Sequence, residues 1–352
     1  MSAREFLLDQ WARHPAFRLQ DLRKALYQST FGCGHLVDDP SAAADWIRRE
    51  AEHAPDCREM EPLEGPWCRV PLGILSEGLT PETLAAAFAQ SAAVPGEDIP
   101  ALEDRLAVLM GLIREGTLPF DPAAAAAEIA AWRAAGFPAC HHSEDYRNAY
   151  HPAYRVLHKR YAHLLPLLAA IDRALGSKPR MLLAIEGGSA SGKSTLAELL
   201  TGIYPDAALF HADDYFLRPE QRMPERFAQP GGNMDRERLE AEILAPLSRG
   251  GDVVYRPFDC KTMSLSEPRR SRAARLNIVE GSYSLHPALE PYYDLSVFLE
   301  ISPESQRRRV LERNGPEWGQ MFFDRWIPLE NTYFQATRTA ERCTLRLKEE
   351  TE

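Results

Sequence analysis

Residues 187–195 read Gly-Gly-Ser-Ala-Ser-Gly-Lys-Ser-Thr, and this stretch decides the fold of the half of the chain that contains it. A continuous apolar run, residues 181–185, stands just before it, and residues 195–200 follow with a helical pattern. An uninterrupted apolar run of this length is typical of a strand buried on both faces of a parallel sheet. A buried strand, a glycine-rich turn and a helix in this order match the phosphate-binding loop Gly-x-x-x-x-Gly-Lys-Ser.

The loop predicts that this half of the chain binds a nucleoside triphosphate. Its glycines let consecutive backbone N–H groups face the phosphates, and the helix that follows adds the positive end of its dipole. Lys193 would neutralise charge on the β- and γ-phosphates, and the Ser194 hydroxyl would ligate Mg²⁺. A chance match in a flexible linker is disfavoured, because a linker is not expected between a buried strand and a helix. We therefore expect ATP and Mg²⁺ as cofactors, bound by Gly187, Gly188, Ser189, Ala190, Ser191, Gly192, Lys193, Ser194 and Thr195.

The pattern of the chain changes at about residue 176. Beyond it, short apolar runs alternate with helical stretches, and the further candidate strands are residues 208–211, 253–255, 276–279 and 295–300. This alternation indicates an α/β domain with a parallel sheet flanked by helices. Before residue 176 the signals are helical: Thr80 and Asp121, each followed by proline, predict helix starts. We expect a mainly α-helical domain over residues 1–176 and a P-loop domain over residues 177–352.

Two acidic residues follow predicted strands of the P-loop domain. Asp213 comes soon after residues 208–211, and Glu280 comes directly after residues 276–279. The carboxyl ends of parallel strands are where such sheets bind ligands, and a carboxylate there can hold a metal directly or through water. For either acid alone, a solvated loop residue or a helix cap would be the better interpretation. Their joint occurrence in one P-loop domain indicates a site, so Asp213 and Glu280 join Ser194 as predicted metal-site residues.

An arginine-rich segment at residues 307–313 has two interpretations. Arg309 and Arg313 are four residues apart and share a helix face, with Arg308 beside them. A run of arginines is usually a solvated surface. In a phosphoryl-transfer enzyme it can instead fold over the triphosphate and stabilise charge in the transition state. The spacing leaves both open.

Taken together, these motifs resemble the uridine kinase family, within the larger group that includes phosphoribulokinase and pantothenate kinase. The resemblance covers about residues 181–345 and begins with the loop, which is close to that family's P-loop. Asp213-Asp214-Tyr215-Phe216 matches a family segment, and the resemblance implies that Asp213 is the catalytic base. Glu280-Gly281 matches the family's Glu-Gly, and Arg308-Arg309-Val310-Leu311 matches its lid.

The resemblance also implies a substrate site. Asn233-Met234-Asp235 corresponds to a family segment whose Asp holds the ribose hydroxyls, and Arg256-Pro257-Phe258-Asp259 to one whose aromatic ring lies against the base. Asp235 also precedes a helical run, so a helix cap is the alternative for it. The implied assignments are catalytic Lys193, Asp213, Arg309 and Arg313, phosphate-binding Arg308, and substrate-binding Tyr215, Asp235, Arg256 and Phe258.

The sequence departs from the family at two places. Residues 260–264 contain no counterpart of the family's base-contacting histidine, and the lid after Arg313 is short and lacks later arginines. The acceptor therefore stays open between a nucleoside, uridine-like as the first hypothesis, and a non-nucleoside polyol or sugar-like molecule. An alternative of another class is an ATP-sensing regulatory module whose helical half binds a partner.

The amino-acid composition of the chain limits the classes of partner that we expect. A formal net charge of −10 argues against broad nucleic-acid binding, which needs a basic surface. The first residues lack the apolar core of a signal peptide, no apolar run is long enough to span a bilayer, and the six cysteines contain no C-x-x-C pair. We expect a cytoplasmic protein with reduced thiols and a small-molecule acceptor, no nucleic-acid or membrane partner, and leave homo-oligomerisation open.

The N-terminal half offers two groups of candidate ligand residues. One is Cys33-Gly34-His35, and the other is Cys140-His141-His142 with His151 and His158. Neither has the spacing of a zinc motif, so solvated or core side chains are the simpler interpretation. Residues 141–155 are dense in Tyr, His and Arg, which is compatible with an amphipathic helix or with a pocket for an anionic or nucleotide-like ligand.

Overall fold

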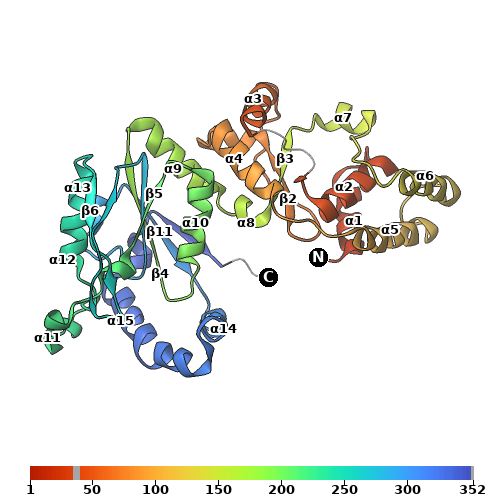
Figure 1. The fold of residues 1–352 in the computed structure, drawn as a ribbon. Coiled ribbons are helices and arrows are strands. Elements are labelled where there is room, and N and C mark those ends of the chain that lie inside the picture. Colours follow the sequence, from red (N-terminus) through yellow and green to blue (C-terminus); the bar gives the residue numbers. More distant parts are fainter. Residues whose placement is uncertain (35–39, 350–352) are drawn as a thin grey trace. The chain divides into compact units, whose positions relative to one another are not determined.

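The computed structural model describes residues 1–34 and 40–349. The chain divides into two compact units, Met1–Ala169 (unit 1) and Ala170–Glu352 (unit 2), shown from red to blue along the chain in Figure 1. The division falls inside helix α9 (Leu165–Ser177), and residue 176, where the sequence pattern changes, lies near the end of the same helix. Among the described helices, none combines the length and the apolar character that a bilayer crossing requires.

Unit 2 is built on a five-stranded parallel sheet with the strand order β12-β11-β4-β10-β5. The strands are β4 (Met181–Gly187), β5 (Ala208–His211), β10 (Leu276–Glu280), β11 (Leu295–Glu300) and β12 (Leu345–Lys348). The central strand β4 is buried along its whole length, and helix α10 (Lys193–Ile203) packs against β4, β5 and β10 (Figure 1). The predicted parallel sheet flanked by helices is confirmed.

Two strands differ from the sequence-based expectation. The predicted strand β6 (Val253–Tyr255) forms, but it pairs antiparallel with β9 (Arg269–Ser271) outside the parallel sheet. Only Val253 of β6 is buried, which suits a two-stranded ribbon on a surface rather than a strand between helix layers. Strand β12 was not predicted, because its apolar residues alternate with Arg346 and Lys348, as is typical of an edge strand.

The other elements of unit 2 are short, apart from the C-terminal helices. Helix α14 (Pro303–Met321) breaks at Gly315, whose φ of 73° is left-handed, and Pro316 follows it. The remaining elements are η3 (Ala212–Tyr215), η4 (Pro219–Gln221), α11 (Pro224–Phe227), α12 (Arg236–Leu239), η5 (Glu240–Leu244), α13 (Ala245–Ser248), β7 (Phe258–Asp259), β8 (Ser264–Leu265), η6 (Glu290–Tyr292), η7 (Phe322–Trp326), α15 (Ile327–Thr337) and α16 (Thr339–Arg342).

Unit 1 is mainly helical, as expected, but it also contains a three-stranded antiparallel sheet, β1 (Glu61–Pro62), β2 (Trp67–Pro71) and β3 (Tyr154–His158). The predicted helix starts are confirmed, since Thr80 and Asp121 cap α4 and α6 through their side chains. The other elements are α1 (Ala3–Arg13), α2 (Leu19–Phe31), α3 (Pro40–Ala51), η2 (Leu72–Glu77), α4 (Pro81–Ala92), α5 (Ile99–Arg114), α6 (Pro122–Ala134), α7 (Glu144–Tyr150) and α8 (Lys159–Ala162).

Candidate functional site

The glycine-rich loop joins the end of β4 to the start of α10. Gly187 has a φ of 153°, and a Cβ there would lie 2.7 Å from Ser191 Oγ and 2.8 Å from the Leu299 carbonyl oxygen. Gly192 has a φ of 98° and is the residue from which α10 begins. Glycine is therefore required at both ends of the turn, because a side chain would clash at one and strain the backbone at the other.

Lys193 occupies the inside of this loop. Its ammonium donates to the carbonyl oxygens of Gly187 and Gly188, at 3.0 and 2.9 Å, and lies 3.4 Å from Ser282 Oγ. The loop thus curls around a single positive charge at the N-terminus of α10, where the helix dipole adds to it. Such an arrangement suits a bound phosphate group.

Ser194 and Glu280, two of the predicted metal-site residues, lie together. The Ser194 hydroxyl donates to Glu280 Oε1 at 3.2 Å, and the Glu280 side chain is buried at the end of β10. Hydroxyl and carboxylate oxygens are the ligands that Mg²⁺ prefers, so these side chains fit the ion. His211, which no sequence motif indicated, has its Nδ1 2.6 Å from the same carboxylate oxygen, and this hydrogen bond raises the pKa of His211.

Asp213, the predicted base and third metal-site residue, lies in η3, just beyond the end of β5. Its side chain keeps contact with solvent, yet desolvation by the surrounding protein raises its pKa. The charge of Glu280 raises the pKa further, while the Lys193 ammonium opposes both effects. Asp213 therefore lies within electrostatic reach of Lys193 and Glu280. All three belong to the carboxyl edge of neighbouring strands β4, β10 and β5.

A buried carboxylate that no sequence pattern indicated contacts the tip of the loop. Glu330 of α15 accepts hydrogen bonds from the Ser189 backbone N–H at 2.8 Å and from the Ser189 hydroxyl at 2.7 Å. The Ser282 hydroxyl also donates to it, at 2.8 Å. Helix α15 is thus tied to the glycine-rich loop and to the segment after β10 by one side chain.

Glu186, directly before the loop, is fully buried and ties the same three segments together. It accepts from the backbone N–H groups of Gly187, Tyr283 and Leu285, each at 3.0 Å, and from the Tyr333 hydroxyl at 3.2 Å. Burial raises the pKa of Glu186 to about 7, against the effect of the backbone donors. Glu186 and Glu330 thus connect the loop to α15 and to the segment after β10 through hydrogen bonds.

The arginines of α14 have different surroundings. Arg309 donates to the Ala190 carbonyl oxygen of the loop at 3.4 Å and pairs with Glu349 at 2.6 Å. Arg308 pairs with Glu312 on its own helix at 3.7 Å, and Arg313 lies over the ring of Phe322 at 5.6 Å. Of the three predicted phosphate contacts, Arg309 reaches the P-loop through the Ala190 carbonyl oxygen.

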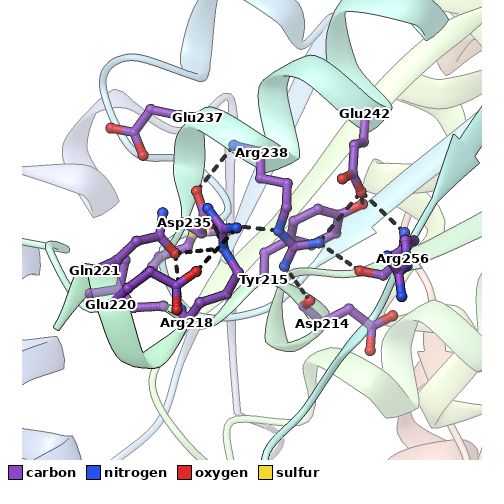
Figure 2. Close-up of polar contacts among 12 residues, drawn as sticks. Asp214, Tyr215, Arg218, Glu220, Gln221, Asp235, Glu237, Arg238, Glu242 and Arg256 are labelled. Carbon is purple, nitrogen blue, oxygen red and sulfur yellow. Dashed lines mark hydrogen bonds and ion pairs between the residues drawn. The ribbon is translucent and has the colours of Figure 1, made fainter. Parts of the chain in front are cut away.

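The predicted substrate residue Asp235 is the N-cap of α12, as Figure 2 shows. Its carboxylate accepts from the Arg238 backbone N–H at 3.3 Å and pairs with the side chains of Arg238 at 3.4 Å and Arg218 at 3.8 Å. Asp235 is only 2% exposed. The helix-cap alternative is therefore present in the structure, and a ligand would have to replace Arg218 to reach this carboxylate.

The other predicted substrate residues are likewise held by protein groups. Tyr215 is buried in the core under the guanidinium of Arg238, 4.2 Å from its ring centre, and its hydroxyl donates to Glu242 at 3.4 Å. Arg256 donates to the carbonyl oxygens of Leu265 and Ser266. Phe258 is buried.

Arg238, which no sequence motif indicated, connects these residues. Its guanidinium donates to the backbone oxygens of Asp214 at 2.9 Å and Arg256 at 2.6 Å, and it pairs with Asp235 and Glu242 (Figure 2). Arg238 thus connects three stretches of chain: its own helical segment, the segment at Asp214 and the segment at Arg256. No sequence motif singles out Arg238, because the two backbone oxygens that it reaches lie 24 and 18 positions away in the chain.

The N-terminal cysteine and histidine residues form no metal centre within the described part of the chain, and His35 lies outside it. His142 is hydrogen-bonded to Asp21 and Tyr154, while His158 accepts from the Arg160 backbone N–H. Cys33 is buried, and its thiol lies 4.0 Å from the Phe88 carbonyl oxygen.

A parallel sheet whose central strand leads through a Gly-x-x-x-x-Gly-Lys-Ser loop into a helix defines unit 2 as a P-loop domain. No protein-family model matches the chain. Among solved structures, the chain is similar to a possible uridine kinase from Bacillus stearothermophilus, with 20% sequence identity, a TM-score of 0.39, and coverage of 51% of this chain and 98% of that chain.

Two further solved structures give comparable figures. A putative fructose transport system kinase from a Silicibacter species has 20% identity and a TM-score of 0.35, with 51% of this chain and 97% of that chain covered. The D-glycerate 3-kinase of Cryptococcus neoformans has 16% identity and a TM-score of 0.37, with 52% and 90% covered. Each likeness extends over about half of this chain.

Proposed function

We propose that unit 2 is an ATP-dependent kinase that transfers the γ-phosphate to a hydroxyl group of a small molecule. The observation that carries this proposal is the contact between Ser194 and Glu280 next to a glycine-rich loop that encloses Lys193. These residues would hold Mg²⁺ and the β- and γ-phosphates of ATP, with Arg309 contacting the loop from outside. Bound Mg²⁺ would supply positive charge to the phosphate oxygens.

Asp213 would take the proton of the acceptor hydroxyl. The acceptor oxygen would then form a bond to the γ-phosphorus while the bond to the β–γ bridging oxygen breaks, which releases ADP. A raised pKa makes this carboxylate a stronger base than an ordinary aspartate. Catalysis would come mainly from positioning and charge neutralisation, since phosphoryl transfer leaves little covalent chemistry to the protein.

A uridine-like nucleoside is the first acceptor to test, and a polyol or sugar-like acceptor is the second. The burial of Asp235 and Tyr215 favours the second, because these are two of the residues expected to contact a nucleoside. The residue expected to bind a diol, Asp235, already has two arginine partners.

The test is a screen of nucleosides, sugars, polyols and hydroxy acids, in which ADP release is measured with ATP and Mg²⁺ present. We expect at least one acceptor to accelerate ADP release in the parent protein and not in Lys193→Ala, with the phosphorylated product visible by mass spectrometry. ATP binding without acceleration by any acceptor in the panel would instead favour the ATP-sensing regulatory module.

A further inference from the structure

Unit 1 contains a pocket of about 410 Å³ that the proposed kinase activity does not use. It is lined by residues of α2, α3 and α4 and by the segment from His141 to Val156. Its volume falls within the range of small-molecule sites, which is about 300–1,000 Å³. The segment rich in Tyr, His and Arg that the sequence analysis selected therefore forms one wall of a cavity.

Lys24 brings a positive charge to this pocket, and the charge of Asp21 acts on it without a direct contact among the described residues. Its ammonium donates to the Cys140 carbonyl oxygen at 2.9 Å, and no carboxylate pairs with it among the described residues. Burial lowers the pKa of Lys24, which shows that its charge is partly removed from water. An ammonium with three donors and a single carbonyl partner can still donate to an anion in the pocket.

Two arginines add to this charge. The Arg147 side chain is exposed and makes no hydrogen bond or ion pair within the described part of the chain. Arg155 pairs with Glu50, also a pocket residue, at 2.7 Å. Burial lowers the pKa of His142 to about 4, so this imidazole is neutral at pH 7. Among the described residues that line the pocket, three carry a positive charge and one, Glu50, carries a carboxylate, so this part of the pocket is set up for an anion.

One side of the pocket, formed by His142, Tyr154 and Gln28, is fixed by hydrogen bonds. His142 Nδ1 lies 2.9 Å from Asp21 Oδ1, and His142 Nε2 lies 2.6 Å from the Tyr154 hydroxyl. Because His142 is neutral, it donates to Asp21 and accepts from Tyr154. Gln28 donates to the same Tyr154 hydroxyl at 3.2 Å, and the Arg69 guanidinium lies over the Tyr154 ring. A wall fixed by such hydrogen bonds is preorganised for a ligand.

We propose that this pocket binds a small organic anion that joins a phosphate or carboxylate group to a planar ring. The acid group would bind Lys24 and Arg147, whose donors are free to receive it. The ring would lie among the aromatic side chains that line the pocket, Trp46, Phe88 and Tyr154. Every residue that carries this site belongs to unit 1, whereas the glycine-rich loop belongs to unit 2.

The test uses the full chain carrying Lys193→Ala, so that binding at the glycine-rich loop is weakened. Phenyl phosphate, benzoate and inorganic phosphate are titrated by calorimetry. We expect at least one of the two ring-bearing anions to bind saturably, about tenfold or more tightly than inorganic phosphate. Whichever of phenyl phosphate and benzoate binds more tightly identifies the acid group.

Substitutions of pocket residues test whether the anion binds in this pocket. Arg147→Ala and Lys24→Met, the latter keeping the aliphatic stem, should each weaken binding by about tenfold or more. Arg114→Ala, an exposed arginine of α5 outside the pocket, is the matched control and should bind like the parent. Circular dichroism checks that each variant is folded. Absence of saturable binding by both ring-bearing anions, or binding that neither pocket variant weakens, overturns the proposal.

Discussion

Glu330 accepts hydrogen bonds from both the backbone N–H and the hydroxyl of Ser189, although 141 positions separate the two residues in the chain. The carboxylate is 4% exposed, so these bonds are made largely out of contact with water. The tip of the glycine-rich loop is therefore held by a helix from the far end of the sequence. Its position depends on the docking of α15 as well as on its own glycines.

Replacing Glu330 with alanine should destabilise unit 2. The change leaves the Ser189 N–H and hydroxyl without their acceptor, at a cost of about 1–3 kcal/mol in the free energy of unfolding, while the Ser282 hydroxyl keeps the Gly187 carbonyl oxygen at 3.0 Å. The measurement is urea denaturation of the parent and the variant. Glu317→Ala, an exposed position of α14, is the control. Equal midpoints for Glu330→Ala and the control would show that this contact does not support the loop.

Lys193→Ala should abolish acceptor-dependent ADP release while the protein stays folded. The ammonium lies inside the loop, and loss of a charge partner for the transferring phosphate costs on the order of 3 kcal/mol, or more than a hundredfold in rate. Lys261→Ala removes an exposed lysine of unit 2 and is the control. Near-normal turnover in a folded Lys193→Ala protein contradicts the kinase proposal.

Asp235→Asn should separate a substrate contact from a helix cap. Asparagine caps a helix as well as aspartate does but removes the charge that pairs with Arg218 and Arg238, so the free energy of unfolding should fall by about 1–3 kcal/mol. If the carboxylate also holds two acceptor hydroxyls, kcat/KM for the acceptor should fall by about tenfold or more, with the KM for ATP nearly unchanged.

The control for this change is Glu220→Gln, which removes an exposed partner of Arg218 without touching the cap. Both variants are assayed with the best acceptor and its deoxy analogues. An Asp235→Asn protein that still discriminates against the deoxy compounds as strongly as the parent excludes Asp235 as the diol contact.

Protonation of His142 should destabilise unit 1 at mildly acidic pH. Its pKa is about 4 in the folded protein, against an ordinary value of 6.5, so between these values the unfolded chain binds more protons. The free energy of unfolding should therefore be independent of this group above about pH 6.5. Between about pH 6.5 and pH 4 it should decrease as the pH falls, by at most about 1.4 kcal/mol per pH unit.

Urea denaturation between pH 4.5 and 7.5 measures this dependence. His142→Gln keeps one donor and one acceptor without a titrating proton. In this variant the free energy of unfolding should depend less steeply on pH, by up to about 1.4 kcal/mol per pH unit. His53→Gln, at an exposed position, should leave the profile as in the parent. A His142→Gln profile as steep as that of the parent would assign the pH dependence to other groups.

A fragment that begins at Leu165, and so keeps α9 whole, should bind ATP with Mg²⁺ as tightly as the full chain. Asp172 of α9 accepts a hydrogen bond from the Tyr204 hydroxyl at 2.9 Å, which is why the helix is retained. All predicted triphosphate contacts lie in unit 2. Calorimetry with ATP checks this, and a folded fragment without ATP affinity would show that unit 1 completes the site.

The features that the sequence by itself determined are local ones. The loop at residues 187–195 was recognisable because its strand, its glycines and its helix follow one another along the chain. The helix starts at Thr80 and Asp121 were predicted for the same reason, since each cap bonds to the residue three positions ahead. Strands β10 and β11 were also identified, because strands buried within a parallel sheet read as apolar runs, and the edge strand β5 was identified from the apolar residues that open it.

Other features were decided only by the tertiary structure. The pairing of β6 with β9, the contacts of Glu186 and Glu330 with the loop, and the pocket around Lys24 all join residues that are distant in sequence. Sequence periodicity states which faces are apolar, but not which segment covers each of them. A carboxylate such as Asp235 therefore reads equally well as a cap or a ligand contact. Its burial against Arg218 and Arg238 depends on how the chain packs.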